Sequence, residues 1–250
     1  SLAETPAIPE DTTAIVIADP QREITDEEAS IIHNYLRIGG RLLLLLEPEP
    51  PQTFKDLLAK WAITVNEGTI VDLASSLAGQ SQTPLIKREQ YITNPPIDAI
   101  TTPLDQGYFP GATSFDPSLP PEEMPEYIAH YPLARTTLLS CLTNDPNVQD
   151  CSGKDFTFQI PAMAIQAIAP LNETPDPNAA RETRIVIFGD ADFATNFHLS
   201  SLSNRDLLLN SVNWLTEDIS LASVRPKPIT FRRLVVTTRE MQLIRALSWF

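Results

Sequence analysis

The fold is decided by Arg184-Ile185-Val186-Ile187-Phe188-Gly189-Asp190-Ala191-Asp192-Phe193. The first five residues of this stretch predict a buried strand, because β-branched and aromatic side chains suit an enclosed, pleated surface. Gly189 is expected to end the strand by adopting backbone angles that other residues avoid. Asp190 and Asp192 follow at the carboxyl end of the strand, where functional groups collect in open α/β sheets. The next segment, Asn204–Leu215, predicts a helix with one apolar face for the sheet.

A strand–helix–strand unit near the amino terminus indicates an α/β fold. Its strands cover Ala14–Ala18 and Leu42–Leu46, and both are apolar throughout. The helix between them begins with a capping box at Thr25 and Glu28 and ends at Gly39-Gly40. Continuous apolar strands joined through a helix favour a parallel sheet with helices on both faces. We therefore expect a mostly parallel sheet in which these two strands are adjacent and the strand quoted first is central or next to central.

The middle of the chain is less regular than its two ends. Between residues 74 and 155 apolar residues come in short groups, while proline, threonine and aspartate are common. The chain has 23 prolines against 8 glycines, which indicates stiff, irregular connections. We interpret the 250 residues as a single α/β domain. Its predicted core covers about residues 8–73 and 156–237, with residues 74–155 as a proline-rich elaboration.

Charge and hydropathy exclude several functions. The net charge of −14 argues against nucleic acid, whose phosphates require lysine and arginine, and against an anionic lipid surface. No run of 18 apolar residues is present to span a bilayer, and no signal peptide is visible. The ending Met241–Phe250 becomes more apolar and stops on two aromatic residues. That ending suits a membrane interface, and equally a surface helix at a natural terminus.

The two cysteines, Cys141 and Cys151, flank a polar loop. Two free thiols would suit a cytosolic protein. Free cysteines are usually buried, however, and a polar loop offers little to bury them. The sequence therefore favours a disulfide, which indicates an oxidising compartment.

The acidic pair after the quoted strand allows two interpretations. Asp190 and Asp192 could bind a divalent metal through their carboxylate oxygens, but the spacing fixes no third ligand. The interpretation we prefer is structural, because buried main-chain amides need hydrogen-bond partners. Five polar side chains are then expected to hold the strand–loop–helix corner: Asp190, Asp192, Asn196, Asn204 and Asp206.

Other catalytic and cofactor motifs are missing from the sequence. The histidines His33, His130 and His198 are scattered. Neither the Gly-x-Ser-x-Gly elbow of hydrolases nor a glycine-rich phosphate loop occurs. We therefore expect no catalytic residues, no metal and no cofactor.

Two groups of short motifs resemble one protein family. The first group is Ile8-Pro9-Glu10-Asp11, Ile15-Val16-Ile17-Ala18-Asp19-Pro20 and Gly39-Gly40-Arg41-Leu42-Leu43-Leu44-Leu45-Leu46-Glu47-Pro48. The second is Phe188-Gly189-Asp190-Ala191-Asp192-Phe193, Asn204-Arg205-Asp206, Asn210, Asn213-Trp214-Leu215 and Arg225-Pro226-Lys227. Together they resemble the GldG-like family, which are gliding-motility-associated auxiliary components of ABC transporters. The resemblance covers both ends of the chain and little of residues 74–155.

The resemblance implies a fold, a location and partners. The fold would be similar to the flavodoxin-like sheet of class I glutamine amidotransferases. The domain would lie on the extracytoplasmic, periplasmic side of the cell membrane, with an anchoring helix starting just after Phe250. Its partners would be the membrane or ATPase subunits of an ABC transporter, or other envelope proteins. Members usually carry a further βα unit ahead of the Ile8–Asp11 turn, so we expect such a unit upstream of this sequence.

The resemblance also identifies a degenerate nucleophile position at Glu47. In amidotransferase-like enzymes, the strand after the Gly-Gly turn delivers a cysteine nucleophile at its carboxyl end. Here Glu47 follows that strand, and Pro48 lacks the N–H that commonly contributes to an oxyanion hole. We therefore expect a non-catalytic domain that binds a protein or an exported polymer. The alternatives are an amidotransferase-like hydrolase and a metal- or carbohydrate-binding module.

Overall fold

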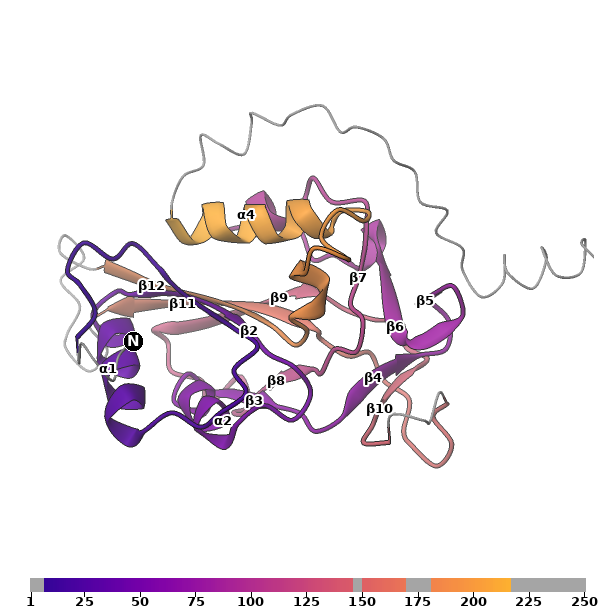
Figure 1. Ribbon diagram of the computed structural model, residues 1–250, viewed down its shortest axis with the longest axis horizontal. Coiled ribbons are helices and arrows are strands. Elements are labelled where there is room, and N and C mark those ends of the chain that lie inside the picture. The colour runs from indigo at the N-terminus through magenta and orange to yellow at the C-terminus, as the bar shows by residue number, and fades with distance from the viewer. Residues whose placement is uncertain (1–6, 146–149, 170–180, 217–250) are drawn as a thin grey trace, which may run out of the picture.

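The computed structural model describes residues 7–145, 150–169 and 181–216, and its centre is a five-stranded sheet (Figure 1). The strands in spatial order are β1 (Ile15–Ala18), β2 (Arg41–Leu45), β12 (Arg181–Phe188), β11 (Ala162–Ala169) and β9 (Ile128–Ala134). Strand β12 contains the sequence motif and is central, as predicted, and β1 and β2 are adjacent.

The sheet is mixed, so the prediction of a mostly parallel sheet is wrong. Strand β2 runs parallel to both β1 and β12, and Leu42 pairs with Ile15 on one side and Ile185 on the other. Strand β11 is antiparallel to β12, and β9 is antiparallel to β11. The reason is the connection between β11 and β12. Residues 170–180 are too few for the helical crossover of a dozen or more residues that a parallel pair requires.

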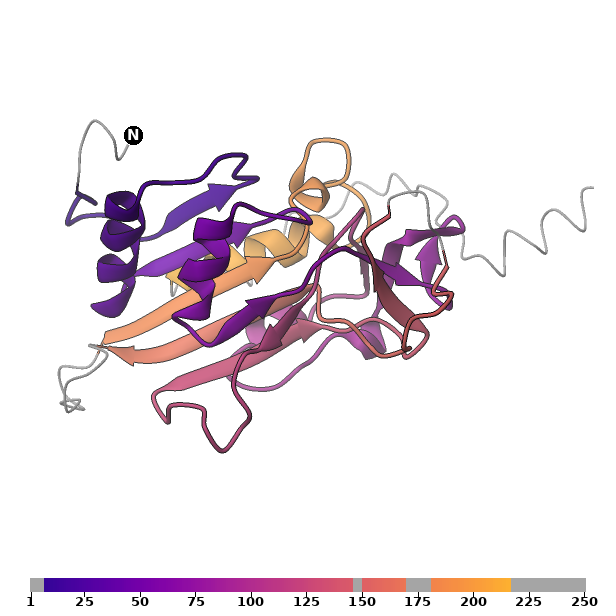
Figure 2. The same ribbon diagram turned by 90° about the horizontal axis from the view of Figure 1, so that it is seen from below.

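Helices cover both faces of the sheet, as expected (Figure 2). Alternate residues of β2 face opposite ways, because side chains alternate along a strand. Leu42, Leu44 and Leu46 pack in the core that contains α1 (Asp26–Arg37) and α2 (Gln52–Ala59). Leu43 and Leu45 pack in the opposite core, with Leu207 and Trp214 of α4 (Asn204–Thr216). The short helix α3 (Asp98–Thr101) contributes Ile100 to the α4 side.

Helix α1 has the ends that the sequence predicts. The Glu28 amide donates to Thr25 Oγ1 at 3.2 Å, and the Thr25 amide donates to Glu28 Oε2 at 3.0 Å, which completes the capping box. At the other end Gly39 has a φ of 98°, a conformation that favours glycine. These two ends place Arg41 at the start of β2.

Gly189 is required for a different reason from the one expected. Its φ is not among the positive values. A Cβ atom at this position would lie 2.2 Å from the carbonyl oxygen of Thr113. The same two residues are hydrogen-bonded, since the Thr113 amide donates to the Gly189 oxygen at 2.8 Å. Thr113, which belongs to the irregular middle of the chain, therefore leaves no room for a side chain at position 189, so this position requires glycine.

Within the described part of the chain, residues 63–143 build three small sheets and supply β9 to the large one. The pairs are β3 (Ile63–Val65) with β8 (Phe115–Pro117) and β4 (Thr69–Asp72) with β10 (Ser140–Thr143). The third sheet contains β5 (Ser76–Leu77), β6 (Gln80–Lys87) and β7 (Gln106–Tyr108). Two 3-10 turns, η1 (Arg88–Gln90) and η2 (Asp192–Ala194), complete the elements of the described residues. Residues 217–237 of the predicted core and the ending Met241–Phe250 lie outside the described residues.

Candidate functional site

Three carboxyl-bearing residues follow the parallel strands at one edge of the sheet. Asp19 follows β1, Glu47 comes two residues after β2, and Asp190 comes two residues after β12. Ala18 and Phe188 both pair with Leu45, so these three strands end level with one another. The carboxyl edge of parallel strands is where α/β proteins commonly place functional groups.

The carboxylate of Glu47 binds the main chain of the turn after β12. Glu47 Oε1 accepts hydrogen bonds from the amides of Ala191 at 2.7 Å and Asp192 at 3.2 Å. Burial raises the pKa of Glu47 to about 7, and the charges of Asp192 and Asp19 add to the rise, while the two amides oppose it. The residue at the predicted nucleophile position therefore joins β2 to the turn that follows β12.

Asp190 is completely buried, and among the described residues only one of its two carboxylate oxygens has a hydrogen-bond partner. Its Oδ1 atom accepts the Phe193 amide at 3.2 Å, whereas Oδ2 has no hydrogen-bond partner among the described residues. Burial raises the pKa of Asp190 well above its usual value, and the charge of Glu47 raises it further. The amides of Phe193 and Asp192 oppose the rise. Glu47 and Asp190 therefore form a coupled carboxyl pair that favours holding a proton near neutral pH.

The other predicted corner residues lie in two places: Asp192 and Asn196 are in the turn and loop after β12, and Asn204 and Asp206 are in the first turn of α4. The Asp192 side chain is exposed, and so is Asn196. Asn204 is buried, accepts the Tyr108 amide through Oδ1 at 3.1 Å and donates to the His198 oxygen at 3.4 Å. Asp206 lies half-buried in the first turn of α4. The structure thus brings Asp190 together with Glu47, and it joins Asn204 to β7 and the loop after η2.

A cavity of about 390 Å³ opens beside Glu47. Its lining is acidic and rich in proline, with Glu23, Glu47 and Glu49 among Pro20, Gln21, Pro48, Pro50 and Pro51. The Glu23 carboxylate accepts the amides of Gln52 at 2.8 Å and Thr53 at 2.9 Å, at the start of α2. The Thr53 amide and hydroxyl and the Gln52 amide lower the pKa of Glu23. Two of the three carboxylates are thus committed to main-chain amides, which favours a structural role for this edge.

The described residues offer little for metal or nucleophilic chemistry. No group of three or more His, Cys, Asp or Glu side chains within residues 7–145, 150–169 and 181–216 could hold a metal ion. The lining of the cavity beside Glu47 contains neither a histidine nor a cysteine. His198 lies elsewhere, with Nδ1 2.9 Å from the hydroxyl of Tyr108. A carboxyl at Glu47 could exchange a proton near pH 7, but no nucleophile–base pair lines this cavity.

The predicted disulfide is confirmed. Cys141 in β10 is bonded to Cys151 with the sulfur atoms 2.03 Å apart, and both residues are buried against Val71 of β4. The bond closes the loop that follows β10. It therefore joins the two sides of the polar loop identified in the sequence.

Sequence reasoning missed a second buried carboxylate, Asp72 at the end of β4. Asp72 Oδ1 accepts the amides of Ala74 and Ser75, both at 3.0 Å, and the Thr137 hydroxyl at 2.7 Å. Its Oδ2 accepts the Thr137 amide at 2.9 Å. The available signal was an acidic residue directly after an apolar run, Ile70-Val71, but Thr137 is too far along the chain to be identified as its partner.

Comparison with known proteins agrees with this architecture. The mixed sheet with helices on both faces gives the described residues a mixed α/β fold. The chain belongs to the family described as "ABC-type uncharacterized transport system" (ABC_transp_aux), whose model matches residues 1–211. Membership makes it an auxiliary component of an ABC-type transport system.

A solved structure described as the "mmIFT52 N-terminal domain" is similar in fold, with a TM-score of 0.57 and 14% sequence identity. The similarity covers 83% of this chain and 78% of that one. None of the curated proteins matches the chain. Among the residues that the structure describes, no helix is both long and apolar enough to cross a membrane.

Proposed function

We propose that the chain is a non-catalytic, extracytoplasmic domain of a GldG-like auxiliary membrane protein, which acts in an ABC-type transport system by binding a protein or an exported polymer. Family membership supports the transport role. The hydrogen bonding of Glu47 is the observation that supports a non-catalytic domain. Its carboxylate accepts two main-chain amides at the position where an amidotransferase-like frame would present a nucleophile.

The location and the domain limits belong to the same proposal. The Cys141–Cys151 disulfide supports an oxidising compartment, and so the periplasmic side of the cell membrane. The chain is then one α/β domain with an anchoring helix after Phe250 and a further βα unit upstream. The corner after β12 is held by the polar residues Asp190, Asp192, Asn196, Asn204 and Asp206. The partners are the membrane or ATPase subunits of the transporter, or other envelope proteins.

An amidotransferase-like hydrolase is the second candidate, and one observation favours it. The raised pKa of Glu47 would suit a group that exchanges protons near neutral pH. Two observations oppose this candidate. Pro48 has no backbone N–H to donate in an oxyanion hole, and the cavity lining beside Glu47 contains no histidine or cysteine.

Hydrolysis assays separate the two candidates. Pure protein is incubated with amide, ester and glutamine substrates, in parallel with Glu47→Ala and with Glu49→Ala as the matched control from the same loop. We expect no turnover above the buffer rate from any of the three proteins. Turnover by the parent that disappears only in Glu47→Ala would overturn the non-catalytic function.

A further inference from the structure

Five large apolar side chains are exposed on neighbouring segments beside the β4–β10 pair. We call this group the apolar tip; its exposed fractions range from 39% to 69%, and its members are Leu73, Leu138, Leu139, Phe156 and Phe158. Main-chain hydrogen bonds join their segments, from the Leu73 amide to the Leu139 oxygen at 3.1 Å and from the Thr157 amide to the Ser140 oxygen at 2.9 Å. Single exposed apolar residues are ordinary, but several together mark an interaction surface.

The two phenylalanines of the apolar tip are on the same side of their segment. The Thr136 amide donates to the Gln159 oxygen at 2.9 Å, and the Gln159 amide donates to Thr136 Oγ1 at 2.8 Å. The segment from residue 156 to 159 is therefore extended beside residues 136–140. Side chains alternate along an extended segment, so Phe156 and Phe158 face away from the buried Gln159.

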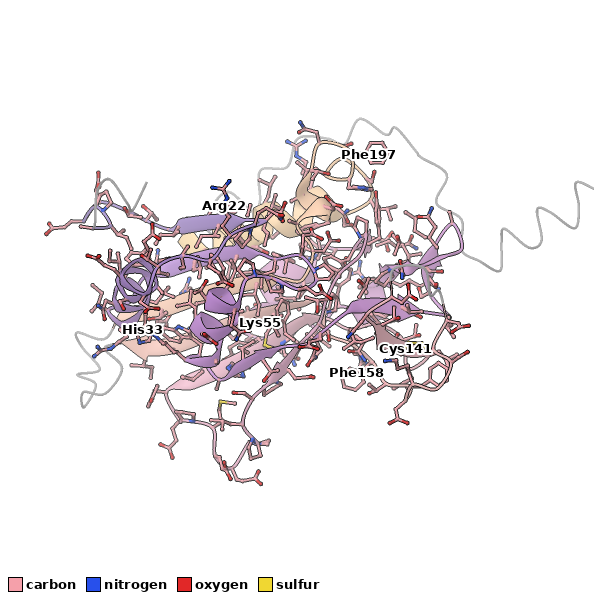
Figure 3. The ribbon with its side chains drawn as sticks, turned by 60° about the horizontal axis from the view of Figure 1, so that its bottom comes forward. Arg22, His33, Lys55, Cys141, Phe158 and Phe197 are labelled. Atoms are coloured by element: carbon pink, nitrogen blue, oxygen red, sulfur yellow. A yellow bond between two sulfur atoms is a disulfide. The ribbon has the colours of Figure 1, made fainter. Side chains whose placement is uncertain are left out.

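Hydrogen bonds and a disulfide hold the segments of the apolar tip in place. The buried carboxylate of Asp72 accepts both the amide and the hydroxyl of Thr137, the residue before the two leucines. The Thr137 hydroxyl also accepts the Leu139 amide at 3.2 Å. The Cys141–Cys151 disulfide joins β10 to the segment that leads to Phe156. Figure 3 shows Phe158 and Cys141 in the same part of the molecule. A surface that is ordered before binding loses less conformational entropy on association.

The charge around the apolar tip indicates what it binds. The loop after β10 presents exposed Asp145, Asp150 and Asp155 against a single cation, Lys154. The whole chain carries a net charge of −14. Like charges oppose both a second copy of the chain and an anionic bilayer, whereas complementary charges around an apolar centre are typical of protein interfaces.

We propose that the apolar tip is the docking surface for another protein, whose contacting segment has an apolar face bordered by lysine and arginine. Leu138 and Phe158 would enter the centre of that contact, and the acidic loop would face its basic border. This inference rests on the proposed binding role of the domain, but not on Glu47 or on the carboxyl edge of the sheet.

The test uses a fluorescent Leu/Lys peptide with amphipathic helical spacing and the intact, disulfide-bonded chain. We expect saturable binding by fluorescence anisotropy. We expect a loss of affinity of about tenfold or more in the double variant Leu138→Ser, Phe158→Ser, because central apolar contacts dominate interface energies. Both side chains are exposed, so the fold should survive the change, and thermal unfolding checks this point.

Two matched controls separate apolar docking from general attraction between opposite charges. Leu209→Ser removes an apolar side chain that is 46% exposed on α4, away from the tip, and should leave the affinity unchanged. A scrambled peptide of the same composition keeps the charge without the apolar face and should bind at least about tenfold more weakly. Equal binding of both peptides, or an equal loss in Leu209→Ser, would overturn the proposal.

Two further results bear on the identity of the occupant. Tighter binding to phosphatidylcholine vesicles through the same two residues would overturn the proposal in favour of a bilayer. Self-association in sedimentation experiments, abolished by the double variant, would overturn it in favour of a second copy. Hydrolysis in the Glu47 assay would refute the non-catalytic function, while the peptide results would stand unaffected.

Discussion

Asp72 and Asp190 are both completely buried carboxylates at strand ends, yet their surroundings are opposite. Asp72 accepts four hydrogen bonds through its two oxygens, and the two from Thr137 hold a loop from a distant part of the chain. Asp190 accepts one bond through Oδ1, has no partner at Oδ2 among the described residues and lies beside another carboxyl, Glu47. Burial alone does not determine whether a carboxylate stabilises a fold. The number and charge of its partners decide this.

The largest expected effect comes from Asp72→Asn. Both oxygens of Asp72 face donors, so an amide nitrogen at either position would meet an N–H or O–H group. We expect the free energy of unfolding to fall by about 2–4 kcal/mol, measured by urea denaturation at pH 7. The control is Asp150→Asn, an exposed residue in the same region, which should change stability by less than about 0.5 kcal/mol. Equal effects of the two substitutions would contradict the role assigned to Asp72.

The comparison also explains what could be predicted from the sequence. The strands β1, β2 and β12 and the helices α1 and α4 are encoded locally, by apolar runs, the Thr25–Glu28 capping box and helical spacing. Each was predicted to within a few residues. The parallel pairing of β1, β2 and β12 followed from the same patterns.

The irregular middle could not be predicted in this way. Strand β9 joins the central sheet, and Thr113 contacts Gly189, through contacts between residues that are far apart in sequence. No periodic pattern records such contacts. The two hydrogen bonds from Thr137 to Asp72 are of the same kind, because Thr137 has no spacing relation to Asp72.

The candidate site was predicted in part. An acidic corner at Asp190 and an altered residue at Glu47 were identified from sequence, but as two separate features. Their proximity follows from β2 and β12 being paired neighbours. The hydrogen bonds from Ala191 and Asp192 to Glu47 depend on the exact turn, which sequence does not specify. The corner role of Asn196 and Asp206 stays a prediction.

The second prediction applies the same Asp→Asn change to Asp190. Its pKa is raised, so the native side chain favours the neutral form, which asparagine resembles in shape and charge. We expect Asp190→Asn to change the free energy of unfolding by less than about 0.5 kcal/mol. Asp190→Ala should lower it by about 1–2 kcal/mol, because the Phe193 amide then has no acceptor. Urea denaturation of both variants at pH 7 provides the measurement.

A metal-binding role for Asp190 would give a different result. Calcium or magnesium would then raise the melting temperature, and Asp190→Ala would abolish the rise. A large loss of stability in Asp190→Asn would also show that this carboxylate is charged and well partnered, and that the contrast with Asp72 is wrong.

The third prediction is a pH dependence that belongs to Glu47. Its pKa is about 7 in the folded chain and near 4.5 in the unfolded chain, so the folded state binds more protons between these values. Stability contributed by Glu47 is therefore fully present below about pH 4.5 and is lost as the pH rises through about 7. We expect the loss to be about 1 kcal/mol, because solvent screens a carboxyl at the wall of an open cavity. The measurement is the free energy of unfolding of the parent and of Glu47→Gln across this range.

The difference between the stability–pH curves of the parent and of Glu47→Gln gives the contribution of the Glu47–Asp190 pair alone. His33 and His130 have lowered pKa values, chiefly because of burial, so they contribute an opposite slope below about pH 6.5 in both proteins. Glutamine at position 47 keeps an acceptor for the Ala191 amide but removes the charge that raises the pKa of Asp190. Part of the missing slope therefore belongs to Asp190, as expected for coupled groups. Parallel curves for parent and variant would show that the pair holds no proton near neutral pH, and that the half-satisfied state of Asp190 has another cause.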